Sequence, residues 1–290
     1  MTVLWRTSWR VAVVGCVFAA TLVSCRLILQ VLGLGLARAP AQAPEEIAGY
    51  YLLAGSIGLA LGTMWVVKGL RASTLGRWSV AAAFVVVGFS LSTTIEAGIY
   101  SASEGVILKV LLLLPPCLAL AMLQVMFFPV DEELGPEPVE APARDLDRRA
   151  WVWRLAIAAL SFPAIYFVFG IIVSPIVMEY YAEGAAGLVL PATGLIVGTQ
   201  VLRGILHVAI VLLIMRVWCR SRRQLVMALT SAFFVFVMMY DVVLAYEVPV
   251  VLIVTHSVEV LADSFVFSWI AVRLLAPLAL DTHDRQAIAS

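Results

Sequence analysis

Long apolar runs, separated by short polar segments, make up most of the chain. Each run has about 20 residues or more, the length that a helix needs to cross the hydrocarbon core of a bilayer. The runs cover residues 11–36, 47–69, 78–100, 105–128, 151–178, 188–217, 225–247 and 250–276. The pattern therefore predicts eight transmembrane helices.

The composition indicates the same class of protein. Hydrophobic residues make up 63% of the 290 residues and charged residues only 13%, and the mean hydropathy is +1.02. These values lie well outside the range of soluble globular proteins. We therefore expect an all-α integral membrane protein whose main partner is the lipid bilayer.

Basic residues gather at alternate ends of the predicted helices. The positive-inside rule assigns such clusters to the cytoplasmic side. The clusters are Arg6 and Arg10; Lys68, Arg71 and Arg77; Arg144, Arg148, Arg149 and Arg154; Arg216, Arg220, Arg222 and Arg223; and Arg273 and Arg285. We expect both termini to be cytoplasmic. The preference for Arg over Lys, with abundant Ala and Val, indicates a bacterial cytoplasmic (inner) membrane.

Matched motifs recur in the two halves of the sequence. "SWRVAVVGCVF" (8–18) matches "VWRLAIAALSF" (152–162), and the basic and aromatic positions that follow also correspond. The later pairs are Arg71 with Arg216, Arg77 with Arg222, Ala83 with Ala228, Phe89 with Phe234, and Glu96 with Asp241. Chance similarity between apolar segments is the alternative explanation. We interpret the matches as a tandem duplication of a four-helix unit.

The duplication predicts the organisation of the chain. Two units with an even number of helices have the same orientation, so they form parallel repeats. The first repeat covers residues 1–128 and the second covers 151–276. Residues 129–150, rich in proline and charge, form a cytoplasmic linker, and 277–290 form a cytoplasmic tail.

Motifs of soluble enzymes and of nucleic-acid binding are missing from the sequence. Its 4 cysteines lack the spacing of a zinc site, a haem attachment site or a redox motif. There is no glycine-rich phosphate loop, no nucleophile elbow and no basic surface with interleaved aromatic residues. We therefore expect no nucleic-acid partner, and the candidate chemistry lies in polar residues within the predicted helices.

These intramembrane polar residues form layers that open toward the outside. Three of them, His256, Glu259 and Asp263, fall within about 60° of each other around one helix and share a stripe. At 1.5 Å per residue, the layers lie at roughly 10, 15 and 20 Å from the outer helix ends. The candidate ligand or ion pathway consists of Arg26, Glu96, Gln200, Arg203, Asp241, His256, Glu259 and Asp263.

Depth also predicts how the buried charges are paired. Arg203 is level with Asp263, and Arg26 is level with Glu259, so we expect these two ion pairs. Burying a charge without such a partner is costly.

Two carboxylates are then left over. Glu96 and Asp241, at equivalent places in the two repeats, have no arginine at their depth. Each must be protonated, hydrated or bound to a cation.

The deeper His207 is interpreted as a packing residue.

Three functions are compatible with this set. We favour an outward-facing site that binds or transports a cation, a proton or a small polar solute. The alternative is a membrane-embedded enzyme that acts on a lipid or lipid-linked substrate, with a divalent metal ion held by His256, Glu259 and Asp241. The third is a structural or assembly subunit in which the polar residues hold helices together.

Overall fold

The computed structural model describes residues 3–33, 45–100, 105–130, 148–182, 190–243 and 249–275. Within these ranges, eight helical stretches are long and apolar enough to cross a bilayer, as predicted. The helices are α1 (Val3–Val31), α2 (Glu45–Lys68), α3 (Thr74–Val85), η1 (Val86–Leu91), α4 (Ser92–Tyr100), α5 (Val106–Phe127), α6 (Arg148–Ala182), α7 (Thr193–Met215), α8 (Arg222–Val243) and α9 (Val250–Leu275). Most helices begin and end within about five residues of the predicted runs, whereas α1 begins at Val3, well before residue 11.

The third span differs from a regular helix. It runs from Thr74 to Tyr100, and it consists of α3, a π-helical turn η1 and α4. A π-helix carries more residues per turn than an α-helix, so η1 rotates the residues that follow it. At Gly88 within η1, a Cβ atom would lie 2.7 Å from the ring of Phe236 on α8. Glycine therefore allows this widened turn to contact α8.

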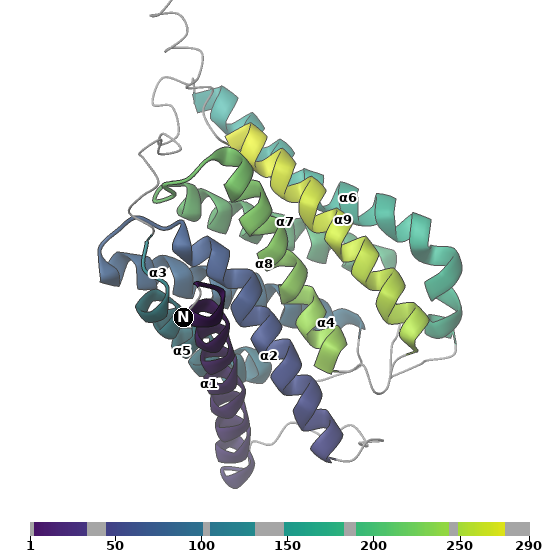
Figure 1. Ribbon diagram of the computed structural model, residues 1–290. Helices are drawn as coiled ribbons and strands as arrows, with labels where there is room; N and C mark the ends of the chain where they lie inside the picture. Colours follow the sequence, from purple (N-terminus) through teal and green to yellow (C-terminus); the bar gives the residue numbers. More distant parts are fainter. Residues whose placement is uncertain are drawn as a thin grey trace, which may run out of the picture.

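The helices pack in a pattern that can be followed in Figure 1. In the first half of the chain, α1 contacts α2 and α5, and in the second half, α6 contacts α7 and α9. The two halves meet where α2 packs against α8. Figure 1 shows α1 (purple) and α9 (yellow) on opposite sides of the bundle. Large buried rings, including Phe84, Phe89 and Phe236, fill the centre between the halves.

Arginine side chains bind the ends of helices at one end of the bundle. Arg10 Nη1 on α1 donates to the carbonyl of Phe127 at the end of α5, at 2.8 Å. Arg154 Nη1 on α6 donates to the carbonyl of Leu274 near the end of α9, at 3.3 Å. The last carbonyls of a helix lack intrahelical partners and carry partial negative charge, so a guanidinium stabilises them.

Two connections meet at the same end of the bundle. The segment between α2 and α3 pairs with the segment between α7 and α8 through a short bridge, Leu70 with Trp218. Arg71 N donates to Val217 O at 2.7 Å, and Cys219 N donates to Gly69 O at 2.9 Å. A Cβ atom at Gly69 would lie 2.1 Å from the Trp218 ring. The contact therefore requires glycine, and it joins the two halves directly.

The outer faces of the peripheral helices are strongly apolar. Ile107 on α5 is 77% exposed and Ile171 on α6 is 71% exposed. In water, so many exposed aliphatic side chains would form a large apolar patch. Their exposure fits the surroundings of a lipid bilayer, and the chain is accordingly a multi-pass membrane protein.

Candidate functional site

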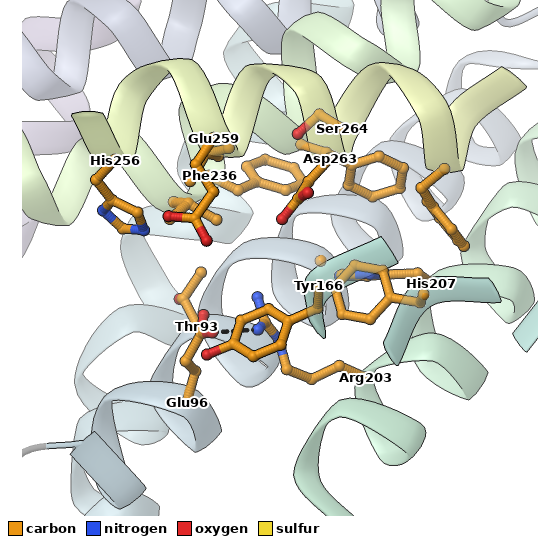
Figure 2. A pocket seen from close by; sticks show the side chains of 16 residues that line it. Thr93, Glu96, Tyr166, Arg203, His207, Phe236, His256, Glu259, Asp263 and Ser264 are labelled. Carbon is orange, nitrogen blue, oxygen red and sulfur yellow. Dashed lines mark ion pairs between the residues drawn. The ribbon is translucent and has the colours of Figure 1, made fainter. Parts of the chain in front are cut away.

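A cavity of about 50 Å³ lies inside the bundle between α4, α6, α7, α8 and α9. A cavity measured in this way needs roughly 10–15 Å³ to hold one water molecule, so this one has room for a few water-sized groups. Its polar walls are Thr93 and Glu96 from α4, Tyr166 from α6, Arg203 and His207 from α7, and His256, Glu259, Asp263 and Ser264 from α9. Figure 2 shows these side chains facing one another across the space.

Arg203 and Glu96 form an ion pair on one wall of the cavity (Figure 2). The Arg203 side chain is 4% exposed and the Glu96 side chain 20% exposed. Gln200, one turn before Arg203, completes the arrangement, because its Oε1 accepts from Arg203 Nη1 at 2.9 Å and its Nε2 donates to Glu96 Oε1 at 3.3 Å. These added hydrogen bonds offset part of the cost of burying two charges.

The polar network continues deeper through Ser92. Arg203 Nε donates to Ser92 Oγ at 3.0 Å, and Ser92 Oγ lies 3.0 Å from His207 Nε2. The Arg203 guanidinium also lies 5.2 Å from the ring centroid of Phe162. Glu96, Arg203, Ser92 and His207 thus form one continuous chain of interactions between α4 and α7.

Two local features bring α4 and α7 into this arrangement. Ser92 and Glu96 directly follow η1, so the π-helical turn determines the direction in which they project. On α7, a Cβ atom at Gly204 would lie 2.2 Å from the carbonyl oxygen of Ala159 on α6. The close approach of these two backbones fixes the neighbouring Arg203 and His207 beside the cavity.

The opposite wall of the cavity belongs to α9. His256, Glu259 and Asp263 project from this helix toward the Arg203 side of the space (Figure 2). Asp263 Oδ1 is buried, and no other described residue hydrogen-bonds to it. The same holds for Nδ1 of His207, a residue that is only 4% exposed. A buried polar atom without a partner costs about 1–3 kcal/mol, so both atoms are suited to bind something within the cavity.

The buried charges are paired differently from the sequence prediction. Arg203 pairs with Glu96, whereas we expected Arg203 to pair with Asp263 and Glu96 to remain unpaired. The prediction rested on depth along straight helices, which put Glu96 in a layer further out than Arg203. The π-helical turn in the third span changes the course of α4, and this turn was not predicted.

Arg26 lies away from the cavity. Its side chain is exposed on α1, which packs against α2 and α5, whereas Glu259 is on α9 at the other side of the bundle. The expected pair of Arg26 and Glu259 therefore does not form. Arg26 is near the end of α1, where an arginine side chain can extend toward the lipid headgroups.

The predicted metal ligands are brought together only in part. His256 and Glu259 are one turn apart on α9, and both line the cavity. Asp241 is on α8, but its side chain lies outside the described residues. Among the side chains that the structure describes, no three of His, Cys, Asp or Glu gather in a way that could hold a metal ion.

Several residues of the cavity were missed by the sequence analysis. His207 does pack in the core, with its ring centroid 4.7 Å from Phe162 and 4.8 Å from Phe233, but it also lines the cavity. Tyr166 lines the cavity and shares a hydrogen bond with the hydroxyl of Tyr100. The four-residue spacing between Arg203 and His207, which puts both on one helical face, was the available signal.

The contact between Ser92 and His207 resembles the pairing of a nucleophile with its general base. However, Ser92 is fully buried and is not one of the residues that line the cavity. Its oxygen also accepts a hydrogen bond from Arg203. A substrate in the cavity would therefore not reach this hydroxyl, and the contact serves to position His207.

No family model, no curated protein and no solved structure matches the chain. The chemistry of the cavity is therefore the basis for assigning a function.

Proposed function

We propose that the protein binds a cation, a proton or a small polar solute in this intramembrane cavity, and that it transports this ligand across the membrane. The observation that carries the proposal is the balance of charge around the space. Three carboxylates line it, Glu96, Glu259 and Asp263, together with two histidines and one guanidinium, Arg203, which is paired with Glu96. Acidic residues buried within a membrane protein commonly mark an ion or substrate pathway.

The cavity is proposed to face the outside of the cell. Two features support this direction. The arginine-rich end of the bundle, which contains Arg10 and Arg154, corresponds to the cytoplasmic side under the positive-inside rule. The bridge between Leu70 and Trp218 joins the connections at that end. Glu96 and His256 lie nearer the opposite helix ends, so a ligand would enter from there.

The proposal includes the tandem duplication of two parallel four-helix repeats, residues 1–128 and 151–276. Equivalent helices contact each other in the two halves, α1 with α2 and α5, and α6 with α7 and α9. The equivalent residues Arg10 and Arg154 bind the ends of α5 and α9 in the same way. These matched contacts support a common origin.

The two repeats nevertheless contribute different residues to the cavity. The π-helical turn precedes Glu96 in the third span, whereas α8, the equivalent helix of the second repeat, is continuous from Arg222 to Val243. The stripe of His256, Glu259 and Asp263 belongs to α9 alone. We therefore propose one site per chain, formed asymmetrically between the repeats.

The proposal is tested by ligand-dependent stability of the purified full-length protein in detergent. Glu259→Gln and Asp263→Asn keep the shape of each side chain and remove its charge. Glu179→Gln is the matched control, because Glu179 is exposed on α6 and does not line the cavity. A ligand at 100 times its dissociation constant adds about 2.7 kcal/mol of stability.

We expect wild type and Glu179→Gln to gain stability from the same cation, and both cavity variants to lose that response. If no cation or change of pH alters the wild-type melting temperature, and the cavity variants are merely less stable, the polar residues serve only to hold the helices together.

A further inference from the structure

We infer that the ligand of this cavity is a small protonated amine, bound by Asp263 and His207 and seated against aromatic rings. The inference rests on the proposed cation site and specifies its ligand. Two observations carry it, the aromatic composition of the walls and the two buried polar atoms that lack partners.

Aromatic side chains make up much of the cavity wall. They come from α6, α8 and α9, and several of them also contact one another in the core. The rings are Phe162, Tyr166, Phe233, Phe236 and Phe267. The face of an aromatic ring attracts a cation, and rings combined with carboxylates are the surroundings in which proteins bind organic ammonium groups. A site for a hard metal ion would instead present oxygen ligands on most sides.

The two unpartnered atoms define where the amine would bind. Asp263 Oδ1 is an acceptor on α9, and His207 Nδ1 is on α7. Ser92 Oγ accepts from Arg203 Nε and lies 3.0 Å from His207 Nε2. We assign the tautomer in which Nε2 carries the proton and donates to the second lone pair of this oxygen. In that tautomer His207 Nδ1 carries no proton, so its lone pair can accept a hydrogen bond. A primary ammonium group has only donors, and in the proposed complex it donates to both atoms.

Arg203 does not fill this role itself. Its guanidinium is engaged by Glu96, Gln200 and Ser92, and it lies over the ring of Phe162. Asp263 Oδ1 therefore remains open to a donor group on a bound ligand. With a volume of about 50 Å³, the cavity accommodates a head group of roughly two to four heavy atoms. Methylammonium and ethylammonium fit this description.

The ligand class is tested by isothermal titration of the full-length protein at constant ionic strength and pH 7. The probes are the chlorides of methylammonium, ethylammonium, tetramethylammonium, sodium, potassium, magnesium and zinc. We expect the two primary amines to bind most tightly. Tetramethylammonium, which has no N–H group, should bind at least about 10-fold more weakly because it cannot donate to Asp263 or His207.

Variants separate the two kinds of contact. Asp263→Asn should weaken methylammonium binding at least about 10-fold, because the ion loses its counter-charge. Phe267→Leu keeps an apolar side chain but removes a ring one turn from Asp263, and it should weaken binding about 2- to 5-fold. The matched control is Phe18→Leu, since Phe18 is fully buried and lies outside the cavity wall. This control should bind methylammonium as wild type does.

The outcomes distinguish this inference from the proposed function. Binding of sodium, potassium or a divalent ion that depends on Asp263, with no binding of primary amines, would overturn the assignment of an amine ligand. The proposed cation site would be retained. Equal binding of tetramethylammonium and methylammonium would overturn the hydrogen bonds to Asp263 and His207. If no probe binds to the wild-type protein, both proposals fail. The wild-type selectivity series decides between these outcomes even if a variant does not fold.

Discussion

Ser92 Oγ lies 3.0 Å from His207 Nε2 and links α4 to α7 in the middle of the bundle. The same oxygen accepts a hydrogen bond from Arg203 Nε at 3.0 Å. Ser92 is the first residue after the π-helical turn η1. A local irregularity in the third span therefore determines which groups line the cavity and how His207 is oriented within it.

Removing the Ser92 hydroxyl should destabilise the protein. Ser92→Ala leaves His207 Nε2 without its observed partner, and a buried polar atom without a partner costs about 1–3 kcal/mol. Ser90→Ala is the matched control, because the Ser90 hydroxyl is equally buried and has no hydrogen-bond partner among the described residues. We expect Ser90→Ala to leave the free energy of unfolding unchanged or to raise it. Equal losses for both variants, measured in mixed micelles, would contradict the proposed contact.

The ion pair between Arg203 and Glu96 should appear as an energetic coupling. Arg203→Ala leaves Glu96 without its counter-charge and should cost about 3–5 kcal/mol. Adding Glu96→Ala should recover part of that loss, with a coupling of about 1–3 kcal/mol in a double-mutant cycle. The matched cycle combines Arg203→Ala with Asp263→Ala. A larger coupling in this second cycle would show that Arg203 is paired as the sequence suggested and not as the structure shows.

The sequence is sufficient to predict the class of the protein and most of its helices. Apolar runs of about 20 residues have no other stable arrangement in a bilayer, because each helix must satisfy its own backbone hydrogen bonds. The helical periodicity also placed His256, Glu259 and Asp263 on one stripe, and all three line one cavity. Such predictions depend only on spacing along a single regular helix.

The partners of the buried charges could not be predicted in the same way. Packing decides which helices are in contact. The depth of a residue in the membrane does not determine the direction in which its side chain points around the helix axis. Arg26 is level with other polar residues in the sequence, yet it is exposed on α1. The π-helical turn before Glu96 also has no clear sequence signature. The pairing of Glu96 with Arg203 therefore became visible only in three dimensions.

The close approach of α6 and α7 behind the cavity can be tested with two glycines of the same helix. Gly204→Ala would place a Cβ atom 2.2 Å from the carbonyl oxygen of Ala159, and backbone atoms cannot move aside cheaply. We expect a loss of about 1–3 kcal/mol. Gly198→Ala meets no atom within 4 Å, so it should be neutral or raise stability by up to about 1 kcal/mol through helix propensity. Similar melting temperatures for the two variants would show that the helices are not packed in this way.

The orientation of the protein is tested by accessibility from the two sides of the membrane. Single cysteines replacing Asp145 and Glu183, in a background without the native cysteines, should be labelled from opposite sides. The positive-inside rule predicts that Asp145 is cytoplasmic. Labelling of both positions from the same side would contradict the eight-span topology.

The most direct test of the cavity as an amine site is the number of methylammonium ions bound per chain. Equilibrium dialysis with radiolabelled methylammonium should give one saturable site in the wild-type protein and in Glu179→Gln. We expect that site to disappear in Asp263→Asn and to weaken strongly in Glu259→Gln, since both carboxylates line the cavity. Saturable binding of the same stoichiometry and affinity in all four proteins, or none in the wild type, would contradict the account.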